Sequence, residues 1–340
     1  MAELGVIGAG SWGTALAIVL ANNGHNVTVW SVIEEEVTML NTYHEHKDKL
    51  PGVKIPDNIS FTTDLKASIE GKEMVVVVVP SPFVRGTAKD MQTFVENGQL
   101  IVVASKGVEE VTLSIMSDIL EQELPQGNIA VLSGPSHAEE VGRGLPTTIV
   151  AGARERKTAE KIQEYFMNDV FRVYTSPDIL GIELGAALKN VIALAAGMAD
   201  GLGFGDNTKA ALITRGIKEI SQLGVKMGAK SETLNGLSGM GDLIVTCASQ
   251  HSRNRRAGML IGQGKSMEEA MKEVQMVVEG VYSAKAAMAL SLKYKVDMPI
   301  VTEVNKVLFE GYDVRKAVIN LMNRDKKSEH EELLWENEDA

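Results

Sequence analysis

The chain has 340 residues, of which 44% are hydrophobic and 23% are charged, as expected for a soluble globular protein with a large core. This length favours two domains over one. The net charge of −11 argues against nucleic acid or an anionic membrane surface as the main partner, so any anionic ligand requires a local basic cluster.

Short β-branched runs alternate with helical patterns in the first half of the chain. The patterns that favour strands are 4–7, 27–30, 75–79, 100–104, 129–132, 147–151 and 171–174, and those that favour helices between them include 14–23 and 113–123. Several strand-like runs are apolar throughout, which is typical of parallel strands covered on both faces. The alternation predicts a doubly wound α/β domain with a Rossmann-like sheet.

The pattern changes near Pro177, where strand-like runs become rare. Ser176 is suited to cap a helix there, with Pro177 at its first position. Further helices are predicted at 184–199, 209–227, 256–262, 267–273, 283–293 and 300–309, and Ser266 and Glu269 form a predicted capping box. We expect a dinucleotide-binding domain over residues 1–177 and an all-α substrate domain over 178–340, ending in an acidic, frayed tail from 328 to 340.

Three features bear on location. The N-terminus, MAELGVIGAG, lacks the basic start and long apolar core of a signal peptide. We find no apolar stretch of the ~18–20 residues that cross a membrane, since the longest strongly apolar run is 74–79. The single cysteine, Cys247, permits no disulfide within the chain and is better explained by packing than as a nucleophile. We expect a cytoplasmic protein without an integral membrane segment.

A glycine motif follows the first strand-like run. In LGVIGAGSWGTALA, Gly8, Gly10 and Gly13 have the G-x-G-x-x-G spacing, and a helical pattern follows. Gly8 permits the tight turn, Gly10 lets backbone N–H groups approach a pyrophosphate, and Gly13 lets helix and strand pack closely. In this context the motif predicts a dinucleotide site on a helix N-terminus, against the alternative of a glycine-rich turn in an unrelated α/β protein.

The choice between NAD and NADP depends on the end of the second strand-like run, VTVWSVIEEE. An acidic residue that holds the ribose of NAD is expected there, but Ser31 occupies the position and Glu34 comes three residues late. No arginine is present for a 2′-phosphate. Both cofactors stay open, and the missing arginine with the nearby acids favours NAD slightly.

Two charged residues, Lys106 and Asp242, could each bind a ligand or have only a structural role. Lys106, in SKG, follows a strand-like run and so lies at the carboxyl edge of the sheet, where α/β proteins bind ligands. Asp242 follows Gly-Met-Gly. Taken alone, Lys106 is better explained as a solvated lysine and Asp242 as a helix cap.

The stretch Ser-Arg-Asn-Arg-Arg at 252–256 is harder to explain as a solvated face. In a chain this acidic, forked guanidinium contacts from it predict a phosphate site. Gly134 and Ser136 form part of a second loop suited to anion or ring contacts. His44 and His46 lack the spacing and cysteine partners of a metal site, so we expect a solvated loop there and no bound metal.

Lys189 stands inside an apolar, helix-like stretch, ELGAALKNVIALAAG. An unpaired charge is costly to bury, so its ammonium either extends to solvent or is aimed at a ligand. The residues of this stretch leave both alternatives open.

Together these stretches resemble the NAD(P)-dependent glycerol-3-phosphate dehydrogenases of bacteria. The resemblance spans nearly the whole chain. The motifs that carry it are GAGSWGTALA, LPGVKIP, VVVVVPS, SKGVE, LSGPSHAEEV, TTIVA, FRVYTSPDILGIELGAALKNVIALAAG, DGLGFGDNTKAALITRG, LSGMGDLIVTC, SRNRRAG, VVEGV and MPI. It implies a Rossmann-like domain followed by an all-helical domain, with the site between them.

The resemblance also implies roles for individual residues, with Lys189 as the proton acceptor. The residues implied to contact the cofactor, besides Gly8, Gly10 and Gly13, are Ser11, Trp12, Lys106, Ala138, Arg253, Val277 and Glu279. Those implied to surround the substrate are Lys106, Gly134, Ser136, Lys189, Asp242, Ser252, Arg253 and Asn254. The chain departs from many relatives at Val32 and Ile33, where they carry basic residues for the adenosine end, and this puts a preference for NADP in doubt.

Oxidation of a secondary alcohol gives Lys189 a chemical task. The nicotinamide takes a hydride, and a base must take the proton. A free lysine has a pKa of about 10.4, but burial and the nearby cations Lys106 and Arg253 lower the pKa into a range of about 7–8, where the amine serves as base or acid. Asp242 opposes this shift and orients the ammonium.

Two rival functions stay open: a two-domain dehydrogenase of a 3-hydroxy acid or a sugar acid, and a non-catalytic dinucleotide sensor. The basic stretch 252–256 favours a phosphorylated substrate over a carboxylate, and an intact Lys189 and Asp242 argue against a sensor. The resemblance further implies that the product supplies the glycerol phosphate backbone of membrane lipids. The apolar helical domain is compatible with a homodimer.

Overall fold

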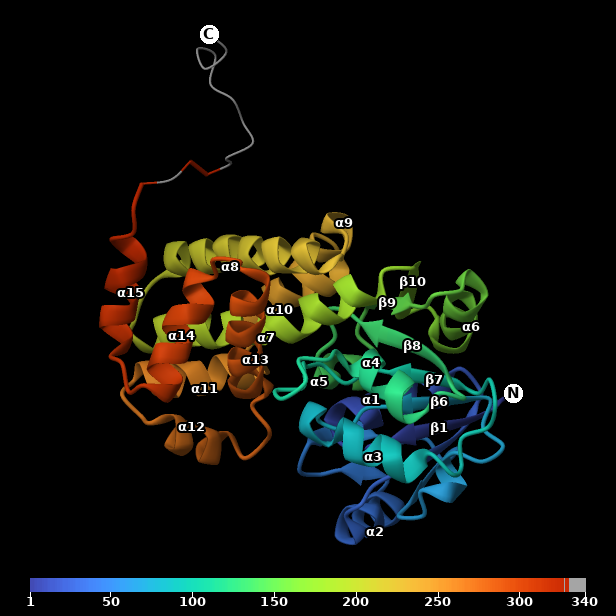
Figure 1. Cartoon of the computed structure of the whole chain (residues 1–340). Helices are drawn as coiled ribbons and strands as arrows, with labels where there is room; N and C mark the ends of the chain where they lie inside the picture. Colours follow the sequence, from blue (N-terminus) through green and yellow to red (C-terminus); the bar gives the residue numbers. More distant parts are fainter. Residues whose placement is uncertain (327, 330–340) are drawn as a thin grey trace.

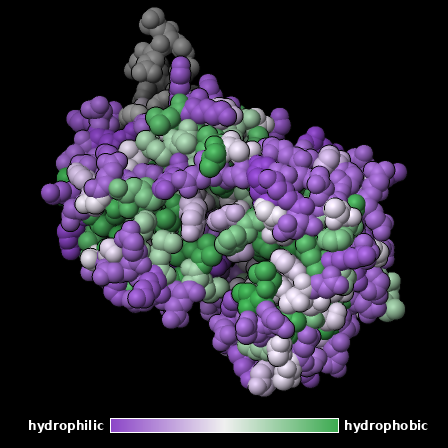
Figure 2. Space-filling model, turned by 60° about the horizontal axis from the view of Figure 1, so that its bottom comes forward, coloured by the Kyte–Doolittle hydropathy of each residue, from purple (hydrophilic) through white to green (hydrophobic). Residues whose placement is uncertain are grey.

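The computed structural model describes residues 1–326, 328 and 329 and has two lobes (Figure 1). One lobe is built around an eight-stranded sheet, and the other consists of the helices α7 to α15. In the view of Figure 2, the surface is hollowed where the two lobes meet. The frayed tail predicted for 328–340 lies, from residue 330 on, outside the described residues.

The large sheet has the strand order β10-β9-β8-β7-β6-β1-β2-β5. Its strands are β1 (Glu3–Ile7), β2 (Asn26–Trp30), β5 (Ile59–Thr62), β6 (Met74–Val77), β7 (Leu100–Val103), β8 (Asn128–Ser133), β9 (Thr147–Gly152) and β10 (Phe171–Ser176). All seven predicted strands are present. Neighbouring strands are parallel, with one exception: β8 and β9 pair in opposite directions.

The antiparallel pair has a local cause. Residues 134–146 connect β8 to β9 and contain only the short helix α5 (Ala138–Gly142). This helix packs against α1 (Ser11–Asn22), so the chain does not return across the sheet as a parallel crossover requires. The apolar character of 147–151 therefore reflects burial, and not a parallel neighbour on both sides.

Helices cover both faces of the sheet, as its fully apolar strands predict. In β6, Met74 and Val76 belong to the hydrophobic cluster shared with α1 and α6, whereas Val75 and Val77 belong to the cluster shared with α3 and α4. This alternation follows from the two-residue period of a strand. Besides α1, the helices that cover the sheet are α3 (Val84–Met91), α4 (Met116–Glu123) and α6 (Arg156–Phe166).

Several elements were not predicted from the sequence. Most are short or rich in polar residues, which weakens the hydrophobic pattern on which a prediction depends. Besides β5, α3 and α6, they are α2 (Glu34–Tyr43), the hairpin strands β3 (Glu45–His46) and β4 (Leu50–Lys54), α9 (Ser231–Leu234) and α15 (Val314–Met322). Helix α10 (Asp242–Ala248) is present where the interpretation of Asp242 as a helix cap expects a helix.

The helices predicted for the second half are all present. They are α7 (Ile179–Gly201), α8 (Asp206–Met227), α11 (Arg253–Gly262), α12 (Met267–Val274), α13 (Glu279–Tyr294) and α14 (Pro299–Phe309). The capping box of Ser266 and Glu269 at the start of α12 is confirmed. The prediction for the start of α7 is wrong: Asp178, not Ser176, is the cap, and its carboxylate accepts a hydrogen bond from Gly181 N at 3.0 Å. Ser176 still belongs to β10, and Pro177 lies in the turn between strand and helix.

Helix α7 is the core of the helical lobe. By length and composition it could cross a membrane, so the expectation that no such stretch exists is wrong; however, 89% of its most apolar window is buried inside the fold. Glu183 and Lys189 interrupt the apolar sequence of α7, so the sequence contains no unbroken apolar run of membrane-spanning length here. Its glycines permit close packing: a Cβ at Gly197 would lie 2.1 Å from the Arg255 carbonyl oxygen of α11.

A buried carboxylate joins the two lobes. Glu183, in the first turns of α7, accepts a hydrogen bond from the backbone N–H of Ser117 in α4 at 3.1 Å, and also one from the Ser117 hydroxyl. Burial raises the pKa of Glu183 to about 8, against the opposing effect of these hydrogen bonds. This contact fixes α7 against the sheet domain and so positions the side chains further along α7.

Candidate active site

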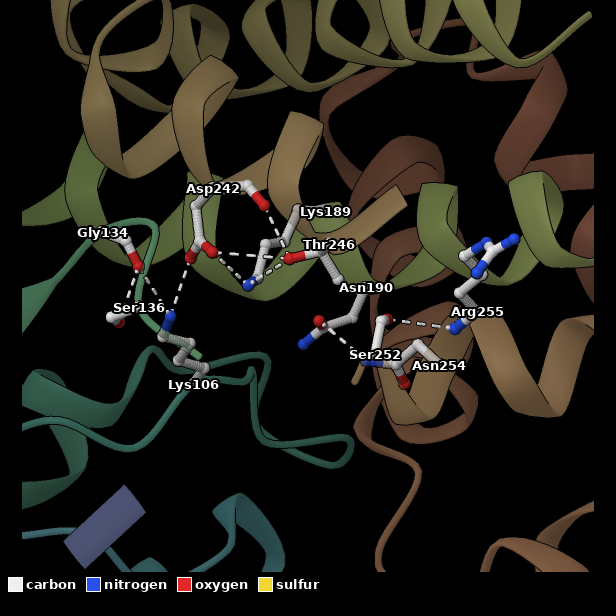
Figure 3. A network of polar contacts seen from close by, with 10 residues as sticks. All are labelled: Lys106, Gly134, Ser136, Lys189, Asn190, Asp242, Thr246, Ser252, Asn254 and Arg255. Carbon is white, nitrogen blue, oxygen red and sulfur yellow. Dashed lines mark hydrogen bonds and ion pairs between the residues drawn. The ribbon is translucent and has the colours of Figure 1, made fainter. Parts of the chain in front are cut away.

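The site forms where the carboxyl ends of the parallel strands face the helical lobe. Lys106 follows β7, and Gly134 follows β8. Lys189 and Asn190 come from the middle of α7, and Asp242 begins α10. Figure 3 shows Lys106 extending from the sheet lobe towards Asp242, so the two lobes meet at this carboxylate.

Lys189 is buried and does not reach solvent, being only 5% exposed. Its Nζ atom donates to Asp242 Oδ1 at 2.5 Å and to the Thr246 hydroxyl at 2.8 Å. Of the two alternatives that the sequence left open, extension to solvent is therefore wrong. The ammonium is held between two oxygens on successive turns of α10.

A widened helical turn brings Asp242 to Lys189. The π-helical turn η3 (Leu237–Gly241) precedes α10, and it approaches α7 closely at Gly185. A Cβ at Gly185 would lie 2.8 Å from the Ser238 carbonyl oxygen, so a larger residue would push the turn away. Asp242 is not the cap of α10: the N-cap is Gly241, and the Asp242 carboxylate points to the two lysines.

Lys106 completes the charged cluster. Its Nζ atom donates to Asp242 Oδ2 at 2.7 Å and to the Gly134 carbonyl oxygen at 3.1 Å. The Ser136 hydroxyl donates to the same carbonyl at 2.9 Å. Lys106 is thus a partly buried member of the site, and the interpretation as a solvated lysine is wrong.

Electrostatics tune Lys189 to neutral pH. Burial lowers the pKa of Lys189 to about 8, with Lys106 adding to the effect and Asp242 opposing it. Burial raises the pKa of Asp242, but the two ammonium groups outweigh burial and hold this pKa below its ordinary value. Asp242 is therefore a carboxylate at neutral pH, while Lys189 exchanges a proton near pH 8.

In the stretch 252–256, some side chains form hydrogen bonds within the fold and others have no partner in the described part of the chain. Ser252 caps α11 through the Arg255 N–H, and Arg255 donates to Asp200 at 2.7 Å. Asn254 donates to Asn190 Oδ1 at 2.9 Å and accepts from Gly280 N at 2.8 Å. Among the described residues, Arg253 forms neither a hydrogen bond nor an ion pair, so its guanidinium is available to a ligand.

The glycine loop fits a dinucleotide. Gly8 has a φ of +119°, which favours glycine, and a Cβ at Gly13 would lie 1.9 Å from the Gly8 carbonyl oxygen. A Cβ at Gly10 would meet nothing within 4 Å, so the backbone there is open to a phosphate. Helix α1 begins at Ser11. The Trp12 indole N–H is buried without a hydrogen-bond acceptor among the described residues, so it can donate to a ligand.

The remaining predicted cofactor contacts come from two elements. Ala138 begins α5 and belongs to the same buried cluster as Ala9 of the glycine loop. Val277 and Glu279 lie at the start of α13 in the helical lobe, and both are partly buried. Burial raises the pKa of Glu279, while Arg253 and Lys106 oppose the shift, so Glu279 lies within the field of the charged cluster.

A buried ionic cluster lies after β2, where the ribose of the cofactor is expected, and no pattern in the sequence indicates it. Ser31 is buried and donates to Glu36 Oε2 at 2.6 Å; Glu36 also accepts from Lys49 and lies 3.1 Å from His46 Nε2. The expectation of a solvated loop is wrong for His46, which is 1% exposed because the β3–β4 hairpin folds onto α2. Burial raises the pKa of Glu36, but its hydrogen bonds, first that of His46, lower it to about 2. Over the described residues, no group of three or more His, Cys, Asp or Glu side chains could hold a metal ion.

Three further residues belong to the site but were not assigned from the sequence. Thr246 bonds Lys189, and its position four residues after Asp242 places it on the same helical face. Asn190 has its amide oxygen bound to Asn254, which leaves its Nδ2 buried without a partner. His137 has a buried Nε2 atom without a partner, and burial, then Lys189, lowers its pKa.

Comparison with known proteins agrees with this geometry. Residues 3–159 match the N-terminal model of NAD-dependent glycerol-3-phosphate dehydrogenase, and residues 178–319 match its C-terminal model. The glycerol-3-phosphate dehydrogenase (NAD(P)+) of Agathobacter rectalis is 66% identical over 98% of this chain and 100% of its own length. That of Fusobacterium nucleatum is 56% identical over 97% and 99%.

Solved structures give the same result. The glycerol-3-phosphate dehydrogenase of Coxiella burnetii has a TM-score of 0.91 and 36% identity, covering 95% of this chain and 99% of that one. A ketopantoate reductase from Ralstonia eutropha, with a TM-score of 0.60 and 15% identity over 94% of this chain and 99% of its own, shares the fold alone. Since the family models and these relatives match nearly the whole chain, it belongs to the NAD-dependent glycerol-3-phosphate dehydrogenase family.

Proposed function

We propose that this protein interconverts sn-glycerol 3-phosphate and dihydroxyacetone phosphate by hydride transfer with NAD or NADP. The observation that carries the proposal is the Lys189 amine, which is buried, bonded to Asp242 and Thr246, and able to exchange a proton near pH 8. In this proposal, residues 1–177 hold the dinucleotide and residues 178–340 hold the substrate.

The chain would supply the proton chemistry. When bound, the nicotinamide supplies the hydride acceptor for oxidation and the hydride donor for reduction. In the oxidation, the neutral Lys189 amine takes the proton of the substrate's secondary hydroxyl while carbon 2 loses its hydride, which leaves a ketone and an ammonium. In the reduction, the ammonium returns the proton to the alkoxide oxygen. Asp242 and Thr246 hold Nζ in place through both directions.

The substrate oxygen has a ready donor beside the base. Asn190 follows Lys189 on α7, and its Nδ2 is buried without a partner, so we place it against the oxygen of carbon 2. Lys106 would contribute positive charge from the other lobe. Such donors stabilise the negative charge that develops on the oxygen.

The phosphate of the substrate would bind at the start of α11. The Arg253 guanidinium is free to make forked contacts there. Ser252 and Asn254 are held by their own hydrogen bonds, so we assign them the task of shaping this end of the site. Gly134 and Ser136 would close the opposite side.

The dinucleotide would bind across the glycine loop. Gly8, Gly10, Ser11, Trp12 and Gly13 would hold the pyrophosphate at the N-terminus of α1. Ala138, Val277 and Glu279 would border the nicotinamide half together with Lys106 and Arg253. We further propose a preference for NAD, because the described ribose end carries the exposed apolar side chains of Val32 and Ile33, followed by the exposed acids Glu34 and Glu35.

One assay tests the reaction. Oxidation of NADH and of NADPH by the purified protein is followed with dihydroxyacetone phosphate and, in parallel, with 3-keto acids of similar size. Turnover with dihydroxyacetone phosphate alone is the expected result. Faster turnover of a 3-keto acid would overturn the substrate assignment, and no turnover with any of them would favour a dinucleotide sensor.

The wider role follows from the reaction. We propose a cytoplasmic enzyme that supplies the glycerol phosphate of membrane phospholipids and that functions without nucleic acid. The net charge of −11 supports the last point. A homodimer through the helical lobe is compatible with the sequence, and sedimentation at several protein concentrations tests it.

A further inference from the structure

The helical lobe has a large apolar groove among α7, α8, α14 and α15, at the end of the lobe away from the sheet (Figure 1). Its volume is about 980 Å³. Among the side chains that line it are Met198, Leu212, Val307, Val318, Leu321 and Met322. A groove of this volume with a mostly apolar lining is typical of binding sites.

The rim of the groove is positively charged. Arg215, Lys218, Lys226, Lys295 and Arg324 line it. Of these, Arg215, Lys226 and Lys295 have no ion-pair partner among the described residues. Three acidic side chains also line the groove, and each already has a partner. Glu219 accepts from Ile300 N at 2.8 Å, Glu303 pairs with Lys306 at 2.7 Å, and Asp297 pairs with Arg324 at 2.6 Å. The rim is therefore suited to an acidic occupant.

The described chain ends at this groove. After α15 the chain turns back, and Ser328 is one of the lining residues. Lys218 of α8 donates from Nζ to the carbonyl oxygen of Glu329 at 2.6 Å. The next residue along the chain thus starts at the rim, beside the basic side chains.

The residues that follow have the composition that the groove requires. The segment 330–340 reads HEELLWENEDA, with three consecutive apolar side chains, Leu333, Leu334 and Trp335, between acidic residues. An extended chain spans ~3.3–3.6 Å per residue, so the four steps from 329 to 333 reach at most about 14 Å. That reach is enough to bring the apolar triplet from the rim into the groove.

We propose that segment 330–340 binds in this groove of its own chain. Leu333, Leu334 and Trp335 fill the apolar floor, and the flanking acidic side chains pair with the basic rim. The segment is tethered at Glu329, so its effective concentration at the groove is high and few contacts are needed to hold it.

Trp335 reports directly on this contact. The difference in emission between the full chain and the Trp335→Phe variant isolates Trp335 from the other two tryptophans. We expect its emission to be blue-shifted, and its quenching by acrylamide to be several-fold weaker, relative to a synthetic peptide of residues 328–340. Equal quenching in the full chain and in the peptide would overturn the proposal.

Two matched variants locate the contact. Ala211 lines the groove and Ala210, its neighbour on α8, does not, while both are exposed. Ala211→Glu places a negative charge in the groove and is expected to raise Trp335 quenching towards that of the peptide; Ala210→Glu is expected to leave it unchanged. The same quenching in both variants would contradict the assignment.

Protein concentration separates this occupant from the alternatives. Binding within one chain makes Trp335 protection independent of concentration from nanomolar to micromolar protein. Protection that grows with concentration would show that the groove holds the segment of a second copy and would overturn the proposal. Trp335 that is unprotected in the purified protein and becomes protected only after extraction with organic solvent and refolding would show that an apolar small molecule occupied the groove, and would overturn the proposal.

Discussion

One carboxylate joins two ammonium groups from the two lobes: Asp242 Oδ1 lies 2.5 Å from Lys189 Nζ, and its Oδ2 lies 2.7 Å from Lys106 Nζ. All three side chains are mostly shielded from solvent. Burial, with the second ammonium adding to its effect, holds the pKa of Lys189 below its ordinary value, while the carboxylate keeps this pKa from falling further.

Replacing Lys189 with alanine should abolish turnover without unfolding the protein. The variant removes the proton acceptor but leaves Asp242 paired with Lys106, so no isolated charge is buried. General acid–base catalysis contributes about 10²–10⁴-fold to a rate, and kcat is expected to fall by at least that factor. Steady-state kinetics and dinucleotide titration measure the two effects. Lys316→Ala, on the exposed surface of α15, is the control, and kcat near that of the control would refute the role of Lys189.

The pH dependence should have opposite signs in the two directions. Oxidation requires the neutral amine, so kcat/KM for the alcohol rises as pH increases through about 8, the pKa of Lys189. Reduction requires the ammonium, so kcat/KM for the ketone falls through the same range. Initial rates from pH 6 to 10 in both directions check this, and a flat oxidation profile between pH 7 and 9 would contradict it.

Asp242→Asn should shift these profiles towards lower pH. Removing the carboxylate removes the main influence that raises the pKa of Lys189, while burial and Lys106 continue to lower it. The rising limb of the oxidation profile therefore moves to lower pH, in addition to a loss of kcat from the misplaced amine. A merely structural role of Asp242 would lower kcat and leave the limb in place, so the pH profile separates the two roles.

The sequence predicted those parts of the structure whose hydrophobic pattern is strong. Seven strands and the main helices could be predicted because short continuous apolar runs mark the strands and apolar residues with a period of 3.6 mark the helices. The glycine loop was found because its residue types are fixed by backbone geometry: only glycine tolerates the φ of +119° at Gly8 without strain. The family resemblance then supplied the site residues, which no periodicity indicates.

The parts that were missed depend on tertiary contacts. Thr246 could have been found from its spacing of four after Asp242, since a helix is expected there, but no pattern in the sequence marks this hydroxyl as a partner of Lys189. Glu36 and His46 look like solvated charges in the sequence. They are buried because a short hairpin folds over them, and such hairpins leave little pattern in a polar stretch.

Arg253→Ala should weaken substrate binding more than it slows chemistry. The guanidinium has no partner to lose among the described residues, so its removal should not disturb the fold. A hydrogen bond to a charged group contributes about 1.5–3 kcal/mol, and the KM for dihydroxyacetone phosphate is expected to rise on the order of tenfold to hundredfold. Arg256→Ala is the neighbouring control. An unchanged KM for Arg253→Ala would show that the phosphate binds elsewhere.

Val32→Arg should move the cofactor preference from NAD towards NADP. Val32 is 76% exposed next to Ser31, and the exposed acids Glu34 and Glu35 follow in the wild-type chain, which disfavours a second phosphate. An arginine at this position can make charge-assisted hydrogen bonds to the 2′-phosphate, so the ratio of kcat/KM for NADPH to that for NADH is expected to rise about tenfold or more. Val111→Arg, at a valine that is 91% exposed after β7, adds the same charge elsewhere on the same domain. An equal rise in both variants would assign the effect to net charge, and a wild-type enzyme that prefers NADPH would overturn the argument from residues 32–35.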